Sequence, residues 1–224
     1  MTVSFEINNE HVNTLGDFTT SLPIISELSK KEGPISITLK NSYKKFIGLK
    51  EFLEYQDFIK YVDFENKESD LNIECCSDFN SNLLCPIRTY TAADRLKCNV
   101  DRSLILKVTP IEISEDIINK KIIIDRWSNN ILRGMGCFKS EDYYWLDYSN
   151  SISYNINICL KAKKVIATST GLPVLLDLFN KEFDLIWFDA NYVDLFIDGI
   201  GGHKEFFFPE RNSKLFYYKD YIYE

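Results

Sequence analysis

The distribution of apolar residues predicts a first half in which helices and strands alternate. Apolar residues recur at helical spacing through residues 18–31, so a helix is expected there. After a Gly-Pro pair, residues 35–39 alternate apolar and polar side chains, which is typical of a half-buried strand. A second helix is predicted over residues 48–61 and a short strand over residues 71–75. The pattern therefore predicts an α/β fold for this part of the chain.

The apolar pattern is interrupted and then starts again in the middle of the chain. Pro110 and an acidic run break it between residues 108 and 119. Residues 121–125 then form a continuous apolar run, which is typical of a strand buried on both faces of a parallel sheet. We therefore expect two small α/β domains, over residues 1–110 and 119–224.

The second half contains a predicted strand–helix–strand unit. A short helix over residues 156–161 is followed by a strand over residues 164–167, a helix over 173–179 and a strand over 185–188. The aromatic C-terminus is expected to pack back on the domains, with a partner interface as the alternative.

Composition and charge argue against several classes of protein. The longest apolar stretches are much shorter than the roughly 20 residues of a membrane-spanning helix, and the N-terminal residues lack a secretory pattern. The six cysteines form no CxxC pair, so we expect reduced thiols, no metal site and a cytoplasmic protein. The net charge of −7 disfavours a broadly basic nucleic-acid surface.

One candidate site lies in the sequence KVIATSTGLPVLL, residues 164–176. It places Ser169, Thr170 and Gly171 between a predicted buried strand and a helix. Backbone N–H groups and the positive end of a helix can receive a phosphate at such a turn. The alternative is structural, with Gly171 ending the strand and a hydroxyl capping the helix.

A second candidate segment is NTLGDFTTSLP, residues 13–23. It opens the first predicted helix with a Gly-Asp turn formed by Gly16 and Asp17. Asp17 is either a helix N-cap or a carboxylate that points into a cleft. The local pattern leaves both interpretations open.

Together these two segments resemble glycosyltransferase family nine, the heptosyltransferase-like enzymes with the GT-B arrangement of two facing Rossmann-like lobes. LGDFTTSLPIISEL resembles the N-terminal Gly-Asp segment of that family, and KVIATSTGLPVLLDLF resembles its C-terminal strand–turn–helix. The spacing of the two segments fits a shortened member of that family. The family usually has an acidic residue where Ser169 stands and a histidine near Val174.

The resemblance implies an inverting glycosyltransferase that needs neither metal nor cofactor and uses a sugar nucleotide as co-substrate. The N-terminal lobe would bind the acceptor and the C-terminal lobe the donor. Asp17 would be the general base, because a sugar hydroxyl is a poor nucleophile until it loses its proton. The other implied site residues are Gly16 and Thr19 on the acceptor side, and Arg126, Arg133, Ser169, Thr170 and Gly171 on the donor side.

Two alternatives remain open beside this hypothesis. The acceptor is either a glycan or a hydroxylated base of phage-type DNA, for which Lys44, Lys45, Lys50 and Lys60 supply a local basic groove. The chain could also be a non-catalytic module that binds nucleotides or another protein. A structural salt bridge is the alternative role for either arginine.

Overall fold

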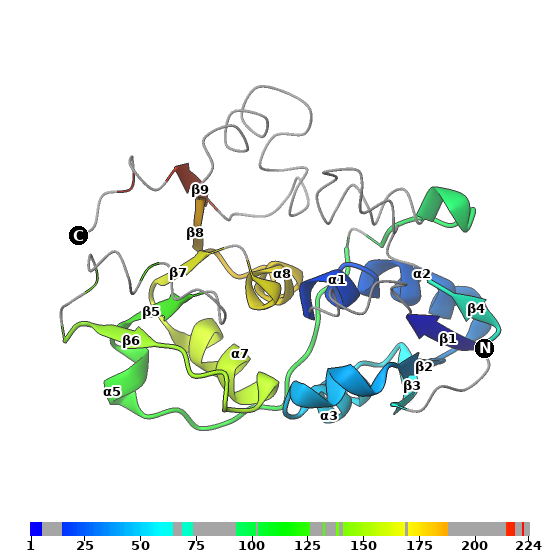
Figure 1. The fold of residues 1–224 in the computed structure, drawn as a ribbon, viewed down its shortest axis with the longest axis horizontal. Helices are drawn as coiled ribbons and strands as arrows, with labels where there is room; N and C mark the ends of the chain where they lie inside the picture. The colour runs from blue at the N-terminus through cyan, green and yellow to red at the C-terminus, as the bar shows by residue number, and fades with distance from the viewer. Residues whose placement is uncertain are drawn as a thin grey trace. The chain divides into compact units, whose positions relative to one another are not determined.

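The computed structural model divides the chain into two compact units, Met1–Thr109 and Pro110–Glu224, which are described separately (Figure 1). In the described part, no helix has the length and apolar character needed to cross a bilayer. The residues that the structure describes are 1–5, 15–64, 69–73, 93–101, 103–125, 132, 138, 141–168, 170–187, 214–217 and 221.

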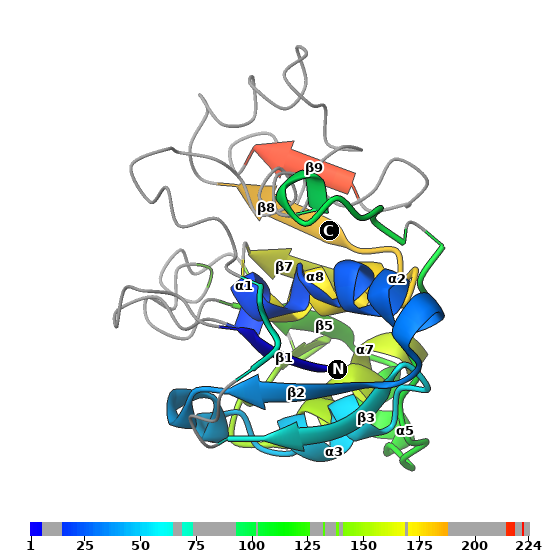
Figure 2. The same ribbon diagram turned by 90° about the vertical axis from the view of Figure 1, so that its right-hand side faces the viewer.

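The first unit is built on a four-stranded parallel sheet with the strand order β3-β2-β1-β4. In the chain, helices connect β1 to β2 and β2 to β3. Helix α2 packs against β2, and Figure 2 shows these two elements. The strands are β1 (Thr2–Phe5), β2 (Ile35–Leu39), β3 (Ile59–Asp63) and β4 (Leu71–Asn72). The helices are α1 (Leu15–Thr19), α2 (Leu22–Glu32), the 3-10 helix η1 (Asn41–Lys45) and α3 (Leu49–Glu54).

The predicted helix over residues 18–31 is two helices. α1 ends at Thr19, and the Ser21 hydroxyl donates a 2.6 Å hydrogen bond to the Phe18 carbonyl beyond that end. Pro23 lies in the first turn of α2, where its missing N–H costs no helical hydrogen bond. Gly33, with a φ of 74°, then ends α2, because a residue without Cβ adopts that backbone conformation without strain.

The predicted helix over residues 48–61 is wrong beyond Glu54. The buried Gln56 side chain donates through Nε2 to the carbonyls of Phe52 and Lys107, at 2.8 Å each, and its Oε1 accepts the Lys107 N–H at 2.9 Å. Residues Ile59–Asp63 then form the edge strand β3, which pairs with β2. Tertiary pairing therefore overrides a sequence pattern that also fits a helix.

The second unit is built on a five-stranded parallel sheet with the strand order β6-β5-β7-β8-β9. The strands expected over residues 121–125, 164–167 and 185–188 are present within one residue at each end. The strands are β5 (Lys121–Ile124), β6 (Tyr143–Trp145), β7 (Val165–Thr168), β8 (Asp184–Trp187) and β9 (Lys214–Tyr217). The helices are α5 (Glu115–Ile118), α7 (Ile152–Lys161) and α8 (Gly171–Leu178).

The two crossover helices of the second unit start earlier than the sequence pattern predicts. α7 begins four residues early because the Ser151 hydroxyl accepts a hydrogen bond from the Tyr154 N–H at 3.2 Å and caps it. α8 begins at Gly171, two residues early. The helices contact each other, and right-handed crossovers place both on one face of the sheet.

The other face of this sheet carries an aromatic cluster. Ile123, Ile166 and Ile186 pack there with Phe138 and Tyr221. The Tyr221 hydroxyl also donates a 2.8 Å hydrogen bond to the Asp184 carboxylate. This part of the aromatic C-terminus therefore packs on its own unit, as predicted.

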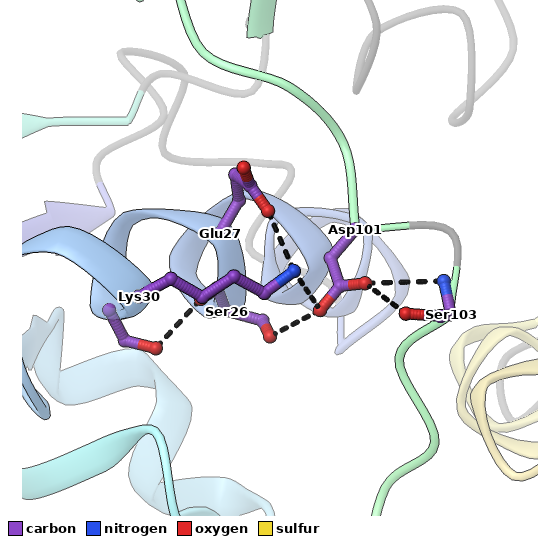
Figure 3. Close-up of polar contacts among 6 residues, drawn as sticks. Ser26, Glu27, Lys30, Asp101 and Ser103 are labelled. Atoms are coloured by element: carbon purple, nitrogen blue, oxygen red, sulfur yellow. Dashed lines mark hydrogen bonds and ion pairs between the residues drawn. The ribbon is translucent and has the colours of Figure 1, made fainter.

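A buried carboxylate attaches α2 to the segment that leaves the first unit (Figure 3). One oxygen of Asp101 accepts from the Ser26 hydroxyl at 2.8 Å and faces the Lys30 ammonium at 3.1 Å. The other accepts from the Ser103 hydroxyl at 2.7 Å and its N–H at 3.2 Å. Burial alone would raise the pKa of Asp101, but these bonds outweigh burial and lower it.

We predict that Asp101→Asn lowers the free energy of unfolding at pH 7 by about 1–3 kcal/mol, because it weakens hydrogen bonds to a buried charge. Since the folded pKa lies below the unfolded value of about 3.9, the carboxylate's contribution is complete above that value and is lost as the pH falls through the folded pKa. Urea unfolding at pH 3 to 7 measures both effects. Asp94→Asn, at an exposed position of the same unit, is the control. An equal loss in the two variants at pH 7 would contradict the prediction.

Candidate functional site

Each parallel sheet has one point where successive connections leave in opposite directions. In the second unit, β5 lies between β6 and β7, and in the first unit β1 lies between β2 and β4. Ligands of open α/β sheets bind in the crevice at the carboxyl ends of the strands on either side of such a point. The topology therefore identifies one candidate edge in each unit.

The candidate edge of the second unit contains the start of α8. Thr170 is the extended N-cap residue of α8, and its side chain makes no capping hydrogen bond. Gly171 and Val174 are half-buried, whereas the other six residues of the helix are buried. Because the first N–H groups of a helix have no partner inside it, this end can receive an anion.

A buried hydroxyl lies at the same edge. Thr168 is the last residue of β7 and is 2% exposed. Its Oγ1 has no hydrogen-bond partner among the residues that the structure describes. A buried hydroxyl without a partner costs free energy, so this edge has unused hydrogen-bonding capacity three residues before the first residue of α8.

Tyr148 lies beside these groups, and the sequence pattern did not indicate it. Its hydroxyl donates a 2.7 Å hydrogen bond to the carbonyl of Asp125, the residue that follows β5. Burial raises the pKa of Tyr148 to about 12, although the nearby Thr170 hydroxyl acts to lower it. Tyr148 is therefore protonated, and a hydrogen-bond donor, throughout the physiological pH range.

The Gly-Asp segment of the first unit lies on the connection that leaves β1, the strand at the candidate edge of that sheet. Asp17 is the third residue of α1, so its backbone is not in the N-cap position. Gly16 is buried, and its carbonyl accepts the Thr20 N–H at 3.1 Å. The buried Thr19 hydroxyl donates to the Leu15 carbonyl at 2.7 Å, so its proton is used within α1.

Several predicted site residues lie outside the described residues. These are Arg126, Arg133, Ser169 and the side chain of Asp17.

Two of the lysines proposed for a basic groove contact aromatic rings of their own unit. The Lys45 ammonium lies 5.0 Å from the centre of the Phe46 ring, and that of Lys50 lies 4.2 Å from the centre of the Tyr61 ring. Lys44 and Lys60 are exposed.

The thiols and acidic groups of the described part form no cluster of metal ligands. Cys98 and Cys159 are free thiols, and complete burial raises the pKa of Cys159 to about 12. Cys159 is therefore a packing residue, unsuited to nucleophilic chemistry.

Solved structures of glycosyltransferases share this fold, although no family model and no curated protein matches the sequence. A glycosyl transferase of family 9 from Veillonella parvula superposes with a TM-score of 0.59 at 7% identity, over 98% of this chain and 86% of that one. The E. coli heptosyltransferase WaaC with ADP gives a TM-score of 0.52 at 9% identity, over 96% and 92%. The iron-containing glycosyltransferase TibC from enterotoxigenic E. coli gives 0.51 at 12% identity, over 83% of this chain and 57% of TibC.

The similarity extends over nearly the whole chain for the first two structures. It shows that the chain has the heptosyltransferase-like GT-B fold of two Rossmann-like lobes, which the resemblance of the two sequence segments implied. At 7–9% identity it shows the fold and leaves the chemistry to the residues of the site.

We predict that Thr168→Val raises the free energy of unfolding by about 1 kcal/mol, because it removes an unpaired buried hydroxyl and keeps the shape of the side chain. Thr19→Val is the matched control: it removes an equally buried hydroxyl that has a partner, and it should cost about 1 kcal/mol. Urea unfolding of both variants provides the comparison. If Thr168→Val costs as much as Thr19→Val, the Thr168 hydroxyl is paired.

Proposed function

We propose that this chain is a glycosyltransferase that transfers a sugar from a sugar nucleotide to a hydroxyl acceptor with inversion. The observation that supports this most is the uncapped N-terminus of α8 at the carboxyl edge of the second sheet, in a fold similar to that of a heptosyltransferase solved with ADP. The same protein has been solved with ADP-2-deoxy-2-fluoro heptose. A nucleoside diphosphate sugar is the donor class that fits this combination.

The donor side of the proposed site depends largely on the backbone. The amides at the start of α8, with the hydroxyls of Ser169 and Thr170, would bind the diphosphate and stabilise the charge that grows on it as the sugar leaves. Gly171 has no Cβ, so a phosphate can approach the backbone closely. Arg126 and Arg133 follow β5 in the sequence and are the proposed cationic partners of the diphosphate.

Asp17 is the proposed general base, on the connection that leaves β1. In the reaction, the acceptor oxygen attacks the anomeric carbon while the bond from that carbon to the diphosphate oxygen breaks. The proton of the acceptor hydroxyl passes to the Asp17 carboxylate, and the nucleoside diphosphate leaves with the electron pair. These steps need no metal or cofactor, since the amides, hydroxyls and arginines carry the charge stabilisation.

The proposed acceptor is a glycan, bound on the first unit near Gly16 and Thr19. A hydroxylated DNA base is the second candidate, favoured by the exposed Lys44 and Lys60. The two differ in salt dependence, because contacts to DNA phosphates weaken steeply as salt rises whereas contacts to a neutral glycan do not.

We predict that one or more sugar nucleotides stabilise the protein against heat. A ligand at 100 times its Kd stabilises the native state by about 2.7 kcal/mol, which corresponds to a rise in Tm of about 5–10 °C for a chain of this size. A thermal-shift screen of ADP-, UDP-, GDP- and CDP-sugars measures this. Arg126→Ala and Arg133→Ala test the cationic partners. No shift with any nucleotide would contradict donor binding, and sugar-nucleotide binding without transfer would instead support the non-catalytic module.

We predict that Asp17→Asn lowers the transfer rate by about 10²-fold or more and leaves donor affinity unchanged, because it removes a basic carboxylate while preserving the size of the side chain. Since Asp17 is not at the N-cap, the change in the free energy of unfolding should stay below about 1 kcal/mol. The measurements are kcat, donor Kd and Tm, with Asp94→Asn as the control. A variant that is folded and equally fast would remove Asp17 from the mechanism.

A further inference from the structure

The carboxyl ends of β5 and β7 place two buried polar residues next to each other. These strands pair in parallel with Ile124 beside Ala167, so the next positions in the same register are Asp125 and Thr168. Asp125 is 7% exposed and Thr168 is 2% exposed. Because neighbouring strands lie about 4.8 Å apart, a carboxylate and a hydroxyl lie side by side at the edge where open α/β sheets bind ligands.

Both residues lie on the face of the sheet that carries the aromatic cluster. Ile123 and Ile166 belong to that cluster, and side chains alternate between the two faces of a strand. Asp125 and Thr168 each follow by two positions and therefore share that face. On its other side, Thr168 pairs with Ile186, which also belongs to the cluster. Of these three neighbours of Thr168, two isoleucines and one aspartate, only Asp125 is polar.

The Thr168 hydroxyl has hydrogen-bonding capacity that the described part of the chain does not use. Its Oγ1 is buried and has no partner among the described residues, and the same is true of Thr170 Oγ1 at the start of α8. Buried polar atoms without a partner are rare in folded proteins. The two hydroxyls therefore point to a partner from outside the described part of the chain, and a ligand at this edge supplies one.

The chemistry beside Thr168 favours a hydroxyl group of the ligand over a phosphate. A carboxylate accepts hydrogen bonds and repels a phosphate, whereas a hydroxyl can donate to the carboxylate and accept from the threonine at the same time. The proposed diphosphate position is at the α8 amides beside Thr170, one residue beyond Ser169. Since the sugar of a donor is bonded directly to the diphosphate, it is the part of the ligand that can reach Thr168.

We propose that Asp125 and Thr168 form the sugar subsite of the donor site, where one sugar hydroxyl donates to the Asp125 carboxylate and accepts from the Thr168 hydroxyl. This inference rests on the proposed function, and it assigns recognition of the sugar to two residues. The two oxygens of a carboxylate accept several hydrogen bonds, so a sugar hydroxyl can bind beside contacts that Asp125 makes within the protein.

Loss of either group should weaken binding of the sugar nucleotide and leave binding of the free diphosphate within about twofold. Thr168→Val removes a neutral hydrogen bond, which corresponds to about threefold to tenfold in Kd. Asp125→Asn removes a charged acceptor, so the loss should be about tenfold or more. Because Thr168→Val is expected to stabilise the ligand-free protein, its weaker binding would not be a result of unfolding.

Calorimetry on the full chain provides the test. The probes are ADP-heptose, UDP-glucose, GDP-mannose and CDP-glucose, each compared with its free diphosphate, and the pair with the largest gain from the sugar is used for the variants. Thr168→Ser keeps the hydroxyl and should retain that gain. Asp184→Asn is the matched control, because Asp184 is 6% exposed and pairs with Lys164 at 2.7 Å near the amino end of β8. It should lower Tm without changing the gain from the sugar.

The outcomes separate this proposal from the proposed function. An equal gain from the sugar in wild type, Thr168→Val and Asp125→Asn would overturn the sugar subsite, with donor binding intact. A parallel loss of affinity for the free diphosphate would also overturn it, since the two residues would then bind the nucleotide. The subsite is equally wrong if the wild type binds a diphosphate and gains nothing from any of the four sugars. If it binds none of the eight compounds, the proposed function itself fails.

Discussion

Parallel pairing is the constraint on which both units depend. Every strand pairing in the described part of the chain is parallel. Consecutive strands pair in parallel only if the chain returns to the end of the sheet where the first strand began, so a crossover segment must connect them. The carboxyl ends of all the strands then lie at one edge of the sheet. The crossovers bury the strands on both faces, which explains why Ile122, Ile123 and Ile124 are fully buried.

In the second sheet, polar groups near the amino ends of the strands differ in their hydrogen bonding from those at the carboxyl ends. Near the amino ends of the strands, the Asp184 carboxylate accepts from Tyr221 at 2.8 Å and pairs with Lys164 at 2.7 Å. At the carboxyl edge, the Asp125 carbonyl is paired with Tyr148, but α8 is uncapped and the Thr168 hydroxyl lacks a partner in the described part. The named polar groups are thus hydrogen-bonded near the amino ends of the strands and partly without partners at the carboxyl ends. This difference is expected where a ligand binds at the carboxyl ends.

The sequence predicts those features whose cause is local. The strand at residues 35–39 and the apolar run from Lys121 are recognisable because each contains its own pattern. The sequence contains no such pattern for β6, because its three half-buried aromatic residues form a strand only through pairing with β5. For the same reason the pattern after Glu54 also fits a helix, and only pairing with β2 makes residues 59–63 a strand.

The residues of the candidate site also fall into those that a local sequence pattern predicts and those that it does not. Thr170 and Gly171 could be predicted because a strand, a short polar turn and a helix follow one another in the sequence. Tyr148 could not, because its partner Asp125 lies 23 residues away and is contacted through a backbone carbonyl, which any residue type provides. A hydrogen bond to a backbone atom does not require a particular residue type at the partner position, so the sequence does not reveal which residues are paired.

The proposed diphosphate site depends mainly on backbone amides, so it tolerates changes in the side chains around it. The chain has Ser169 where the glycosyltransferase family it resembles usually has an acidic residue, and it lacks the histidine that the family usually has near Val174. The amides at the start of α8 are present with any residue except proline, and Pro173 removes only one of them. The diphosphate binding proposed for these amides therefore does not depend on the side chains at positions 169 and 174. Recognition of the sugar depends on side chains, so it is the property that these two substitutions should alter most.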